Sequence, residues 1–214
     1  MKLHWSPRSP FVRKVMITLH ELGRVDEVTL MRNTVASHLP PNPAVLADNP
    51  LGKIPALVTD TTVLFDSRVI CAFLNRDGAL PDSIDAQRWQ ALADGGTDIL
   101  LAWRTELARP QGQWTAITDS YGAKLRAVLS VLNAEADRLH ATPFGPGHVA
   151  IICFLGQLDF RWGDSAWRDH FPQLAALDSV WAIRASVRAT AIVNDNDDGN
   201  DLTAGELRFE KETP

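Results

Sequence analysis

The sequence has little cysteine, no long apolar run and no excess of basic residues. Two cysteines in 214 residues cannot form a disulfide framework, and their positions lack metal-ligand spacing. Their scarcity favours a reducing cytoplasm. No apolar stretch approaches the roughly 18 to 20 residues that a membrane helix needs, and the N-terminus has no apolar segment typical of a secretory signal. The net charge of -5 and the pI of about 5.6 indicate no general affinity for nucleic acid or acidic membranes.

What is present is an ordinary globular composition. Apolar residues make up 45% and charged residues 22%, which excludes a disordered chain, a coiled coil and a collagen. The length suits one large domain or two small ones. Seven tryptophans accompany a single tyrosine, and such flat apolar rings suit either a hydrophobic ligand or a packed core.

Short strand-like segments alternate with helices over residues 1–76, in the order βαβ, a loop, then ββα. Residues 77–83 have the Gly, Pro and Asp content of a linker. Residues 84–193 carry apolar residues at helical spacing, and residues 194–214 form a polar, acidic tail. We therefore predict an α/β domain followed by an all-helical domain. The expected long helices are 84–108, 118–140, 148–160 and 174–190.

The segment Ser6-Pro7-Arg8-Ser9-Pro10 lies between the first expected strand and the first expected helix. Ser9 occupies the N-cap position, and Pro10 the first helical position. A helix N-terminus offers unpaired N–H groups and about half a positive charge, so it stabilises an anion such as a thiolate. The Ser9 hydroxyl could donate a hydrogen bond to that thiolate. Capping of the helix alone would explain the same residues.

The segment Asn49-Pro50-Leu51-Gly52-Lys53-Ile54-Pro55-Ala56-Leu57 places a proline inside an apolar strand pattern. Proline removes a donor from the strand ladder. A cis bond between Ile54 and Pro55 at the strand entry would leave the Ile54 backbone groups free to pair with an extended peptide. An ordinary edge-strand proline is the alternative.

Asp66 and Ser67 begin another expected helix, and both are good capping residues. The same pair could bind a ligand that carries an ammonium and a carboxylate at one end. The Asp66 carboxylate would then take the ammonium, while the Ser67 hydroxyl and nearby N–H groups would take the carboxylate.

These three sites together would hold a thiol at a helix tip, a peptide backbone beside a strand and an amino-acid head. SPRSPFVRKV, NPLGKIPALV and LFDSRVI resemble three motifs of the cytosolic glutathione S-transferase family, bacterial and serine-type, in the same order and at similar separations. The resemblance covers nearly the whole chain. It implies a thioredoxin-like N-terminal domain with a mixed four-stranded sheet, an all-helical C-terminal domain and a homodimer.

The resemblance also implies how glutathione is activated. Ser9 would donate a hydrogen bond to the glutathione sulfur, with Ser6 as the fallback and Arg13 as a further basic candidate near the site. The thiolate would attack a hydrophobic electrophile, a detoxification reaction that needs no metal and no cofactor other than glutathione as co-substrate. Serine in place of cysteine disfavours mixed disulfides and thiol transfer.

The rest of the tripeptide is assigned in the same way. The Ile54 backbone, next to cis-Pro55, would pair with the cysteinyl part of glutathione. Asp66 and Ser67 would hold the γ-glutamyl end, and Lys53 could pair with the glycyl carboxylate.

The acceptor pocket is expected between the two halves, where the first long helix of the helical half lines it. Trp103, Leu107 and Trp114 are the candidates, and core packing is their alternative role. A non-catalytic glutathione-binding or partner-binding protein on the same fold is the rival to the enzyme, because a fold does not imply a function.

The sequence departs from the family where the core helix begins. The family often has a Ser/Thr-x-x-Asp capping box there. Here Gly145 replaces the hydroxyl residue and His148 stands in place of the aspartate. Loss of this capping box can cost about 1 kcal/mol of stability, and the alternative is that another cap compensates. Cys71 and Cys153 fall on expected helices with apolar neighbours, so we interpret both as core residues.

Overall fold

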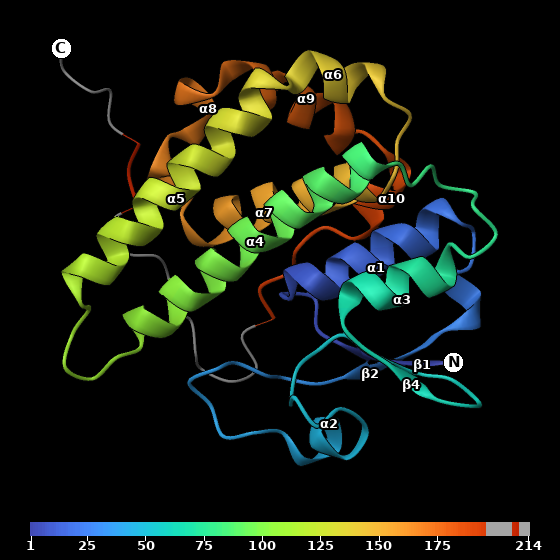
Figure 1. Ribbon diagram of the computed structural model, residues 1–214. Coiled ribbons are helices and arrows are strands. Elements are labelled where there is room, and N and C mark those ends of the chain that lie inside the picture. The colour runs from blue at the N-terminus through green and yellow to red at the C-terminus, as the bar shows by residue number, and fades with distance from the viewer. Residues whose placement is uncertain (196–206, 210–214) are drawn as a thin grey trace, which may run out of the picture. The chain divides into compact units, whose positions relative to one another are not determined.

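The computed structural model describes residues 1–195 and 207–209, which form two compact units (Figure 1). The first unit contains Met1–Pro81 and the described residues from Ala185 onward to 195. The second contains Asp82–Arg184 and residues 207–209. The divide between them at residue 81 falls inside the expected linker.

The first unit is built on a mixed four-stranded sheet in the order β2-β1-β3-β4, as predicted. Strand β1 runs parallel to β2 and antiparallel to β3, and β3 runs antiparallel to β4. A helix connects the parallel pair, and a tight turn connects β3 to β4. The strands are β1 (Lys2–Trp5), β2 (Thr29–Arg32), β3 (Ala56–Val58) and β4 (Val63–Leu64).

Helices α1 (Pro10–Glu21) and α3 (Ser67–Leu74) pack against each other and against one face of this sheet (Figure 1). Leu3 of β1 points into this core, and the next residue, His4, points to the opposite face because side chains alternate along a strand. The 3-10 helix η1 (Val25–Glu27) precedes β2, and the short helix α2 (Pro43–Asp48) follows it. The apolar core includes Leu3, Val15, Leu19, Leu57 and Ile70.

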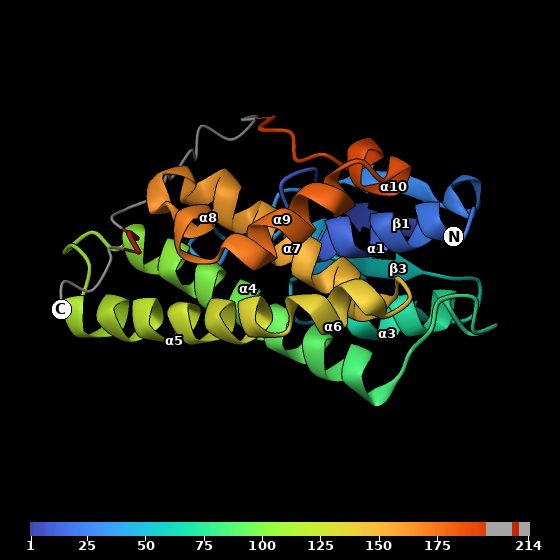
Figure 2. The ribbon, with the colours of Figure 1, turned by 90° about the horizontal axis from the view of Figure 1, so that it is seen from above.

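Helix α10 (Ala185–Ala189) belongs to the first unit, whereas the predicted helical domain ran to residue 193. It packs on α1 (Figure 2). The Ser186 hydroxyl donates to Glu21, and the Arg13 guanidinium donates to the Val187 carbonyl oxygen at 3.5 Å. Ser186 and Val187 are buried in this contact. The remainder of the expected tail, apart from 207–209 and its first two residues, lies outside the described residues.

The second unit is helical, as predicted, and α7 is its most buried helix. Helix α7 packs on α4 and α9, and α9 also contacts α5, α6 and α8 (Figures 1 and 2). Among the described residues, no helix is long and apolar enough to cross a membrane. The helices are α4 (Ile84–Leu107), α5 (Thr115–Ala134), α6 (Ala136–Ala141), α7 (Pro146–Arg161), α8 (Trp167–His170) and α9 (Pro172–Ala182), with the 3-10 helix η2 (Gly163–Ser165) between α7 and α8.

Two glycines allow α4 and α7 to approach closely. A Cβ atom at Gly147 of α7 would lie 2.8 Å from the Ala86 carbonyl oxygen of α4. A Cβ atom at Gly96 of α4 would lie 2.8 Å from the Phe154 ring of α7. Both distances are too short for real Cβ atoms, so this helix pair depends on glycine at both positions.

His148 replaces the usual carboxylate at the start of α7. Its Nδ1 accepts a hydrogen bond from the Gly145 N–H at 3.1 Å, so its Nε2–H donates to the Leu139 carbonyl oxygen at 3.0 Å. The imidazole is buried against the rings of Phe144 and Trp181. Burial lowers the pKa of His148 below its ordinary value of 6.5. His148 therefore supplies a hydrogen-bond partner at the start of α7 in place of the usual carboxylate, which agrees with the alternative of a compensating cap.

Candidate functional site

Ser9 caps the N-terminus of α1. Its backbone is extended, and its Oγ accepts a hydrogen bond from the Val12 N–H at 3.3 Å. A hydroxyl accepts with its lone pairs and donates with its hydrogen, so this cap leaves the Ser9 O–H able to donate to a ligand. The Phe11 amide forms no hydrogen bond with any described residue. One N–H of the helix terminus is therefore available beside the hydroxyl.

Ser6 has a different environment from Ser9. Its side chain is buried, and its Oγ accepts from the Arg8 N–H at 3.4 Å. The Ser6 carbonyl oxygen accepts from the Ser9 N–H at 3.2 Å, which closes the turn before α1. Ser9 is the more exposed of the two hydroxyl groups.

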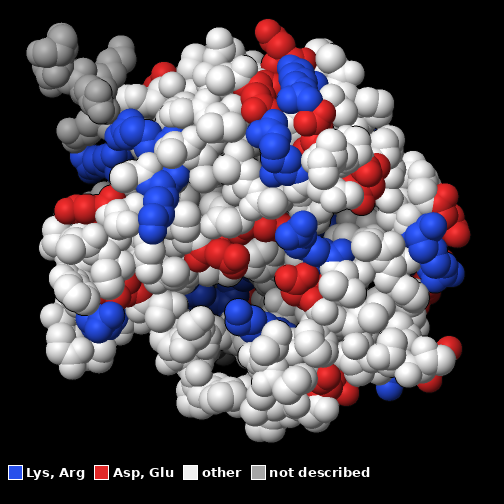
Figure 3. Space-filling model, in the orientation of Figure 1, with Lys and Arg blue, Asp and Glu red and all other residues white. Residues whose placement is uncertain are grey.

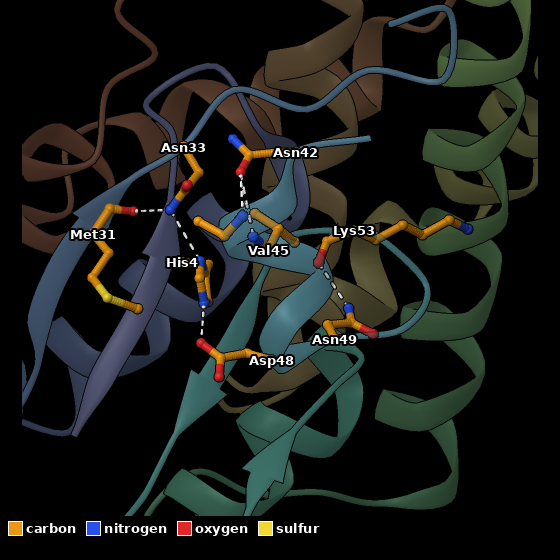
Figure 4. A network of polar contacts seen from close by, with 9 residues as sticks. His4, Met31, Asn33, Asn42, Val45, Asp48, Asn49 and Lys53 are labelled. Atoms are coloured by element: carbon orange, nitrogen blue, oxygen red, sulfur yellow. Dashed lines mark hydrogen bonds and ion pairs between the residues drawn. The ribbon is translucent and has the colours of Figure 1, made fainter. Parts of the chain in front are cut away.

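The loop from Asn49 to Pro55 is organised by the buried side chain of Asn49 (Figure 4). The Asn49 amide donates to the Lys53 carbonyl oxygen at 2.8 Å, and its Oδ1 accepts from the Leu51 N–H at 3.0 Å. Gly52 has a φ of 61°, a left-handed conformation that favours glycine. The sequence motif contained Asn49, but nothing within the motif indicated that its side chain holds both halves of the loop.

The Ile54–Pro55 bond is cis, as predicted. The Ile54 side chain is buried in the core, and β3 begins two residues later. Neither the amide nor the carbonyl of Ile54 forms a hydrogen bond with another described residue. Both groups are therefore available to an extended peptide.

Asp66 and Ser67 lie at the start of α3. Asp66 is the N-cap residue, and its Oδ1 accepts from the Arg68 N–H at 3.0 Å. The Asp66 side chain is exposed, which leaves its second carboxylate oxygen open to solvent or ligand. Ser67 is buried, and its hydroxyl forms no hydrogen bond with another described residue. The Phe65–Asp66 peptide bond is also cis.

A polar network around the buried side chain of His4 was not predicted. His4 Nε2 lies 2.8 Å from Asp48 Oδ2, and Asn33 Nδ2 lies 3.0 Å from His4 Nδ1 (Figure 4). Asn33 Nδ2 also donates to the Met31 carbonyl oxygen, so this amide is the donor to Nδ1, and Nε2–H donates to Asp48. The network connects β1, the end of β2 and the end of α2, immediately before Asn49. The three polar residues are far apart in the sequence, so no local pattern indicated it.

The two basic candidates are placed differently. Arg13 donates to the Val187 carbonyl oxygen of α10, and its Nε is buried without a hydrogen-bond partner among the described residues. The Lys53 side chain is exposed and extends away from the loop that Asn49 holds (Figure 4). Lys53 is therefore the more accessible cation.

The three candidates for the acceptor pocket all lie in the second unit. Trp103 is 5% exposed, and its ring packs against those of Tyr121 and Trp162 at centroid distances of 6.0 and 5.9 Å. Trp114 is 63% exposed, and Leu107, the last residue of α4, is partly buried. Trp103 is thus a core residue of this unit, whereas Trp114 presents its ring to solvent.

Charges on the visible face are interspersed, with no large field of one sign (Figure 3). Among the described residues, no group of three or more His, Cys, Asp or Glu side chains is arranged to hold a metal ion. Neither Cys71 nor Cys153 forms a disulfide, and both are buried, in agreement with the core role expected for them.

A mixed sheet of this topology, flanked by α1 and α3 and followed by an all-helical unit, is the architecture of glutathione transferases. Residues 8–77 match the family described as Glutathione S-transferase, N-terminal domain. The chain is 33% identical over 193 residues to the uncharacterized GST-like protein YibF of Escherichia coli (strain K12), a match that covers 83% of this chain and 91% of YibF. The chain therefore belongs to the glutathione S-transferase family.

Two crystal structures of glutathione transferase family members from Pseudomonas fluorescens Pf-5 are also similar. One, with bound glutathione, is 39% identical with a TM-score of 0.84, over 90% of this chain and 98% of that chain. The other, with bound S-(propanoic acid)-glutathione, is 37% identical with a TM-score of 0.80, over 90% of this chain and 100% of that chain.

Proposed function

We propose that this protein is a glutathione transferase that activates the glutathione thiol at the N-terminus of α1 for attack on a hydrophobic electrophile. The observation that carries the proposal is the Ser9 hydroxyl, which caps α1 through its oxygen and keeps its hydrogen for a ligand. Glutathione bound in a similar structure supports this ligand. We further propose that the protein acts in the cytoplasm as a homodimer, with glutathione as its co-substrate and no other cofactor.

The chemistry follows from the pKa of the thiol. A free cysteine thiol has a pKa of about 8.5, so little of it is ionised at neutral pH. Lowering that pKa by about two units requires roughly 2.7 kcal/mol of preferential stabilisation of the thiolate. The α1 dipole, the Phe11 amide and the Ser9 hydroxyl are suited to supply much of it. The sulfur then bonds to the electrophilic carbon, and serine acts only as a hydrogen-bond donor.

The remaining contacts orient the tripeptide. The Ile54 amide and carbonyl would pair with the cysteinyl backbone of glutathione, as an added strand. The open carboxylate oxygen of Asp66 would take the γ-glutamyl ammonium, and the Ser67 hydroxyl the neighbouring carboxylate. Lys53 would pair with the glycyl carboxylate. The candidates for the acceptor pocket, which would bind the electrophile, remain Trp114, Leu107 and Trp103. The bound S-(propanoic acid)-glutathione of a similar protein supports a site that also accommodates a sulfur substituent.

The test compares Ser9→Ala with Ser6→Ala. Thiolate absorbance of bound glutathione, titrated against pH, should show a depressed thiol pKa in the unaltered protein. Ser9→Ala should raise that pKa by about one unit and lower turnover about tenfold or more, the size expected for loss of one donor to a developing charge. Ser6→Ala should leave the thiol pKa of bound glutathione unchanged and should change turnover by less than about twofold.

Three results would contradict the proposal. Unchanged thiolate absorbance and turnover in Ser9→Ala would remove Ser9 from the mechanism. Retention on glutathione resin without a depressed thiol pKa would favour the rival, a non-catalytic glutathione-binding protein. Robust disulfide reductase turnover would favour thiol-transfer chemistry instead.

A further inference from the structure

The carboxylate of Asp195 lies between two arginines of the first unit. Asp195 Oδ1 is 2.9 Å from Arg8 Nε, and Asp195 Oδ2 accepts from Arg32 Nε at 2.8 Å and also from Arg32 Nη2. Arg32 Nη1 in turn donates to the Thr34 hydroxyl at 3.0 Å. We name this group of residues the arginine clasp: Arg8, Arg32 and Asp195.

The clasp lies at the end of the sheet where α1 begins. Arg8 immediately precedes Ser9 in the chain. Arg32 pairs with Trp5 in the parallel register of β1 and β2, and Ser6 follows Trp5 directly. The carboxyl ends of parallel strands lie at the same edge of a sheet, and ligands of α/β folds bind outside that edge. A carboxylate held by these two arginines is therefore close in the fold to the proposed thiolate position.

The contact on the Arg8 side is not an ideal ion pair. Asp195 Oδ1 is buried but forms no aligned hydrogen bond within the described residues, although Arg8 Nε is near. The Arg8 side chain is only 8% exposed, and the nearby Asp195 carboxylate offsets part of the cost of burying its charge. Arg32 is 30% exposed and opens the clasp to solvent. A better-aligned carboxylate from a ligand could replace that of Asp195 without leaving the guanidinium groups unpaired.

We propose that Arg8 and Arg32 recognise a carboxylate on the electrophile, and that Asp195 occupies this place when no such acceptor is bound. The inference rests on the proposed function and names its acceptor class, apolar electrophiles that also carry a carboxylate. With an α,β-unsaturated acid, the thiolate sulfur bonds to the β-carbon, the π electrons move to the α-carbon, and that carbon takes a proton from water. The carboxylate is unchanged in the conjugate.

Asp195 acts as a tethered competitor in this arrangement. Because Asp195 belongs to the same chain as the two arginines, its carboxylate has an effective concentration on the order of millimolar beside them. A carboxylate that is joined to bound glutathione is also held close to the arginines, so it can compete with Asp195 for them. Substitution of Asp195 should therefore favour acidic conjugates specifically.

The experiment measures binding of S-(2-carboxyethyl)glutathione and S-propylglutathione by calorimetry, with glutathione itself as reference. The two conjugates differ only in a carboxylate in place of a methyl group. The unaltered protein should bind the acidic conjugate about tenfold more tightly, a difference typical of one charge-assisted contact. Arg32→Gln should reduce this preference to less than about threefold without changing affinity for S-propylglutathione. Asp195→Asn should raise affinity for the acidic conjugate alone.

The controls separate the clasp from general effects. Arg24→Gln removes an arginine of the same unit that pairs with Glu27, and it should leave the preference unchanged. Arg32→Gln serves as the main variant because Arg32 is the more exposed of the pair, and Arg8→Gln is the second. Equal affinity of the unaltered protein for both conjugates, or a preference that survives Arg32→Gln, would overturn the inference. If glutathione and both conjugates all failed to bind, the proposed function would fall together with it.

Discussion

The starts of α1 and α7 meet the same requirement in opposite ways. Both helices begin with N–H groups that lack helical partners. At α1 a partly exposed serine supplies the cap and keeps a hydrogen to donate. At α7 a buried histidine supplies it, and both ring nitrogens are occupied by backbone groups. The start of α1, where we propose that the glutathione thiolate binds, stays open, whereas the start of α7, which supports the core, is closed.

The largest expected effect is a loss of folding stability when the histidine at the start of α7 is removed. His148→Ala removes the partner of the Gly145 N–H and the Leu139 carbonyl and leaves a cavity among aromatic rings. We expect a loss of about 3 kcal/mol in the free energy of unfolding, measured with urea. Glutathione affinity of the folded variant should be unchanged. The exposed His140 provides the control, and His140→Ala should cost less than about 0.5 kcal/mol. Similar losses in both variants would show that the cap of α7 has no special role.

The next largest effect is the pH dependence of the free energy of unfolding, which we expect His148 at the start of α7 to cause. Because the pKa of His148 is lowered in the folded protein, the unfolded chain binds more protons as the pH falls below about 6.5. The stability contributed by the neutral imidazole is therefore complete above the unfolded pKa and decreases on acidification. Urea unfolding between about pH 7.5 and 5.5 should show a loss of about 1 kcal/mol that His148→Gln removes. An identical pH slope in that variant would contradict the assignment.

The smallest effect on stability is expected for Ser9, at the start of α1. Ser9→Ala should cost about 1 kcal/mol, the ordinary value of an N-cap. Ser83 caps α4 in the same way, through the Ala86 N–H at 3.2 Å, and Ser83→Ala should cost a similar amount. Turnover should fall in Ser9→Ala only. Equal turnover in the two variants would erase the functional distinction between the two caps.

Local patterns predicted much of the fold and of the candidate site. The Ser9 cap, the cis bond before Pro55 and the Asp66 cap were each predicted from residues within a few positions. The helix expected over 84–108 closely matches α4. One helix was expected over 118–140 because the apolar spacing continues across Glu135, but the structure divides this stretch there into α5 and α6.

The second half of the helix expected over 174–190 shows why other features were missed. Its last residues form α10, which packs on α1 through Ser186 and Val187. The periodicity of that segment was correctly interpreted as helical, but it contains no information about which unit the helix packs on. The role of Asn49 in holding its loop was missed for the same reason, since a burial of 1% cannot be seen in a motif.

Caps, turns and amphipathic periods depend on neighbours in the chain, so reading the residues in order was enough to place Ser9, Ile54 and Asp66 at element boundaries. The His4 network and the arginine clasp join residues separated by as many as 187 positions, between Arg8 and Asp195. Such contacts form only after the sheet and its flanking helices have packed. Hydrogen bonds and ion pairs between distant segments are therefore properties of the folded chain, and they hold the loops around the proposed glutathione site in place.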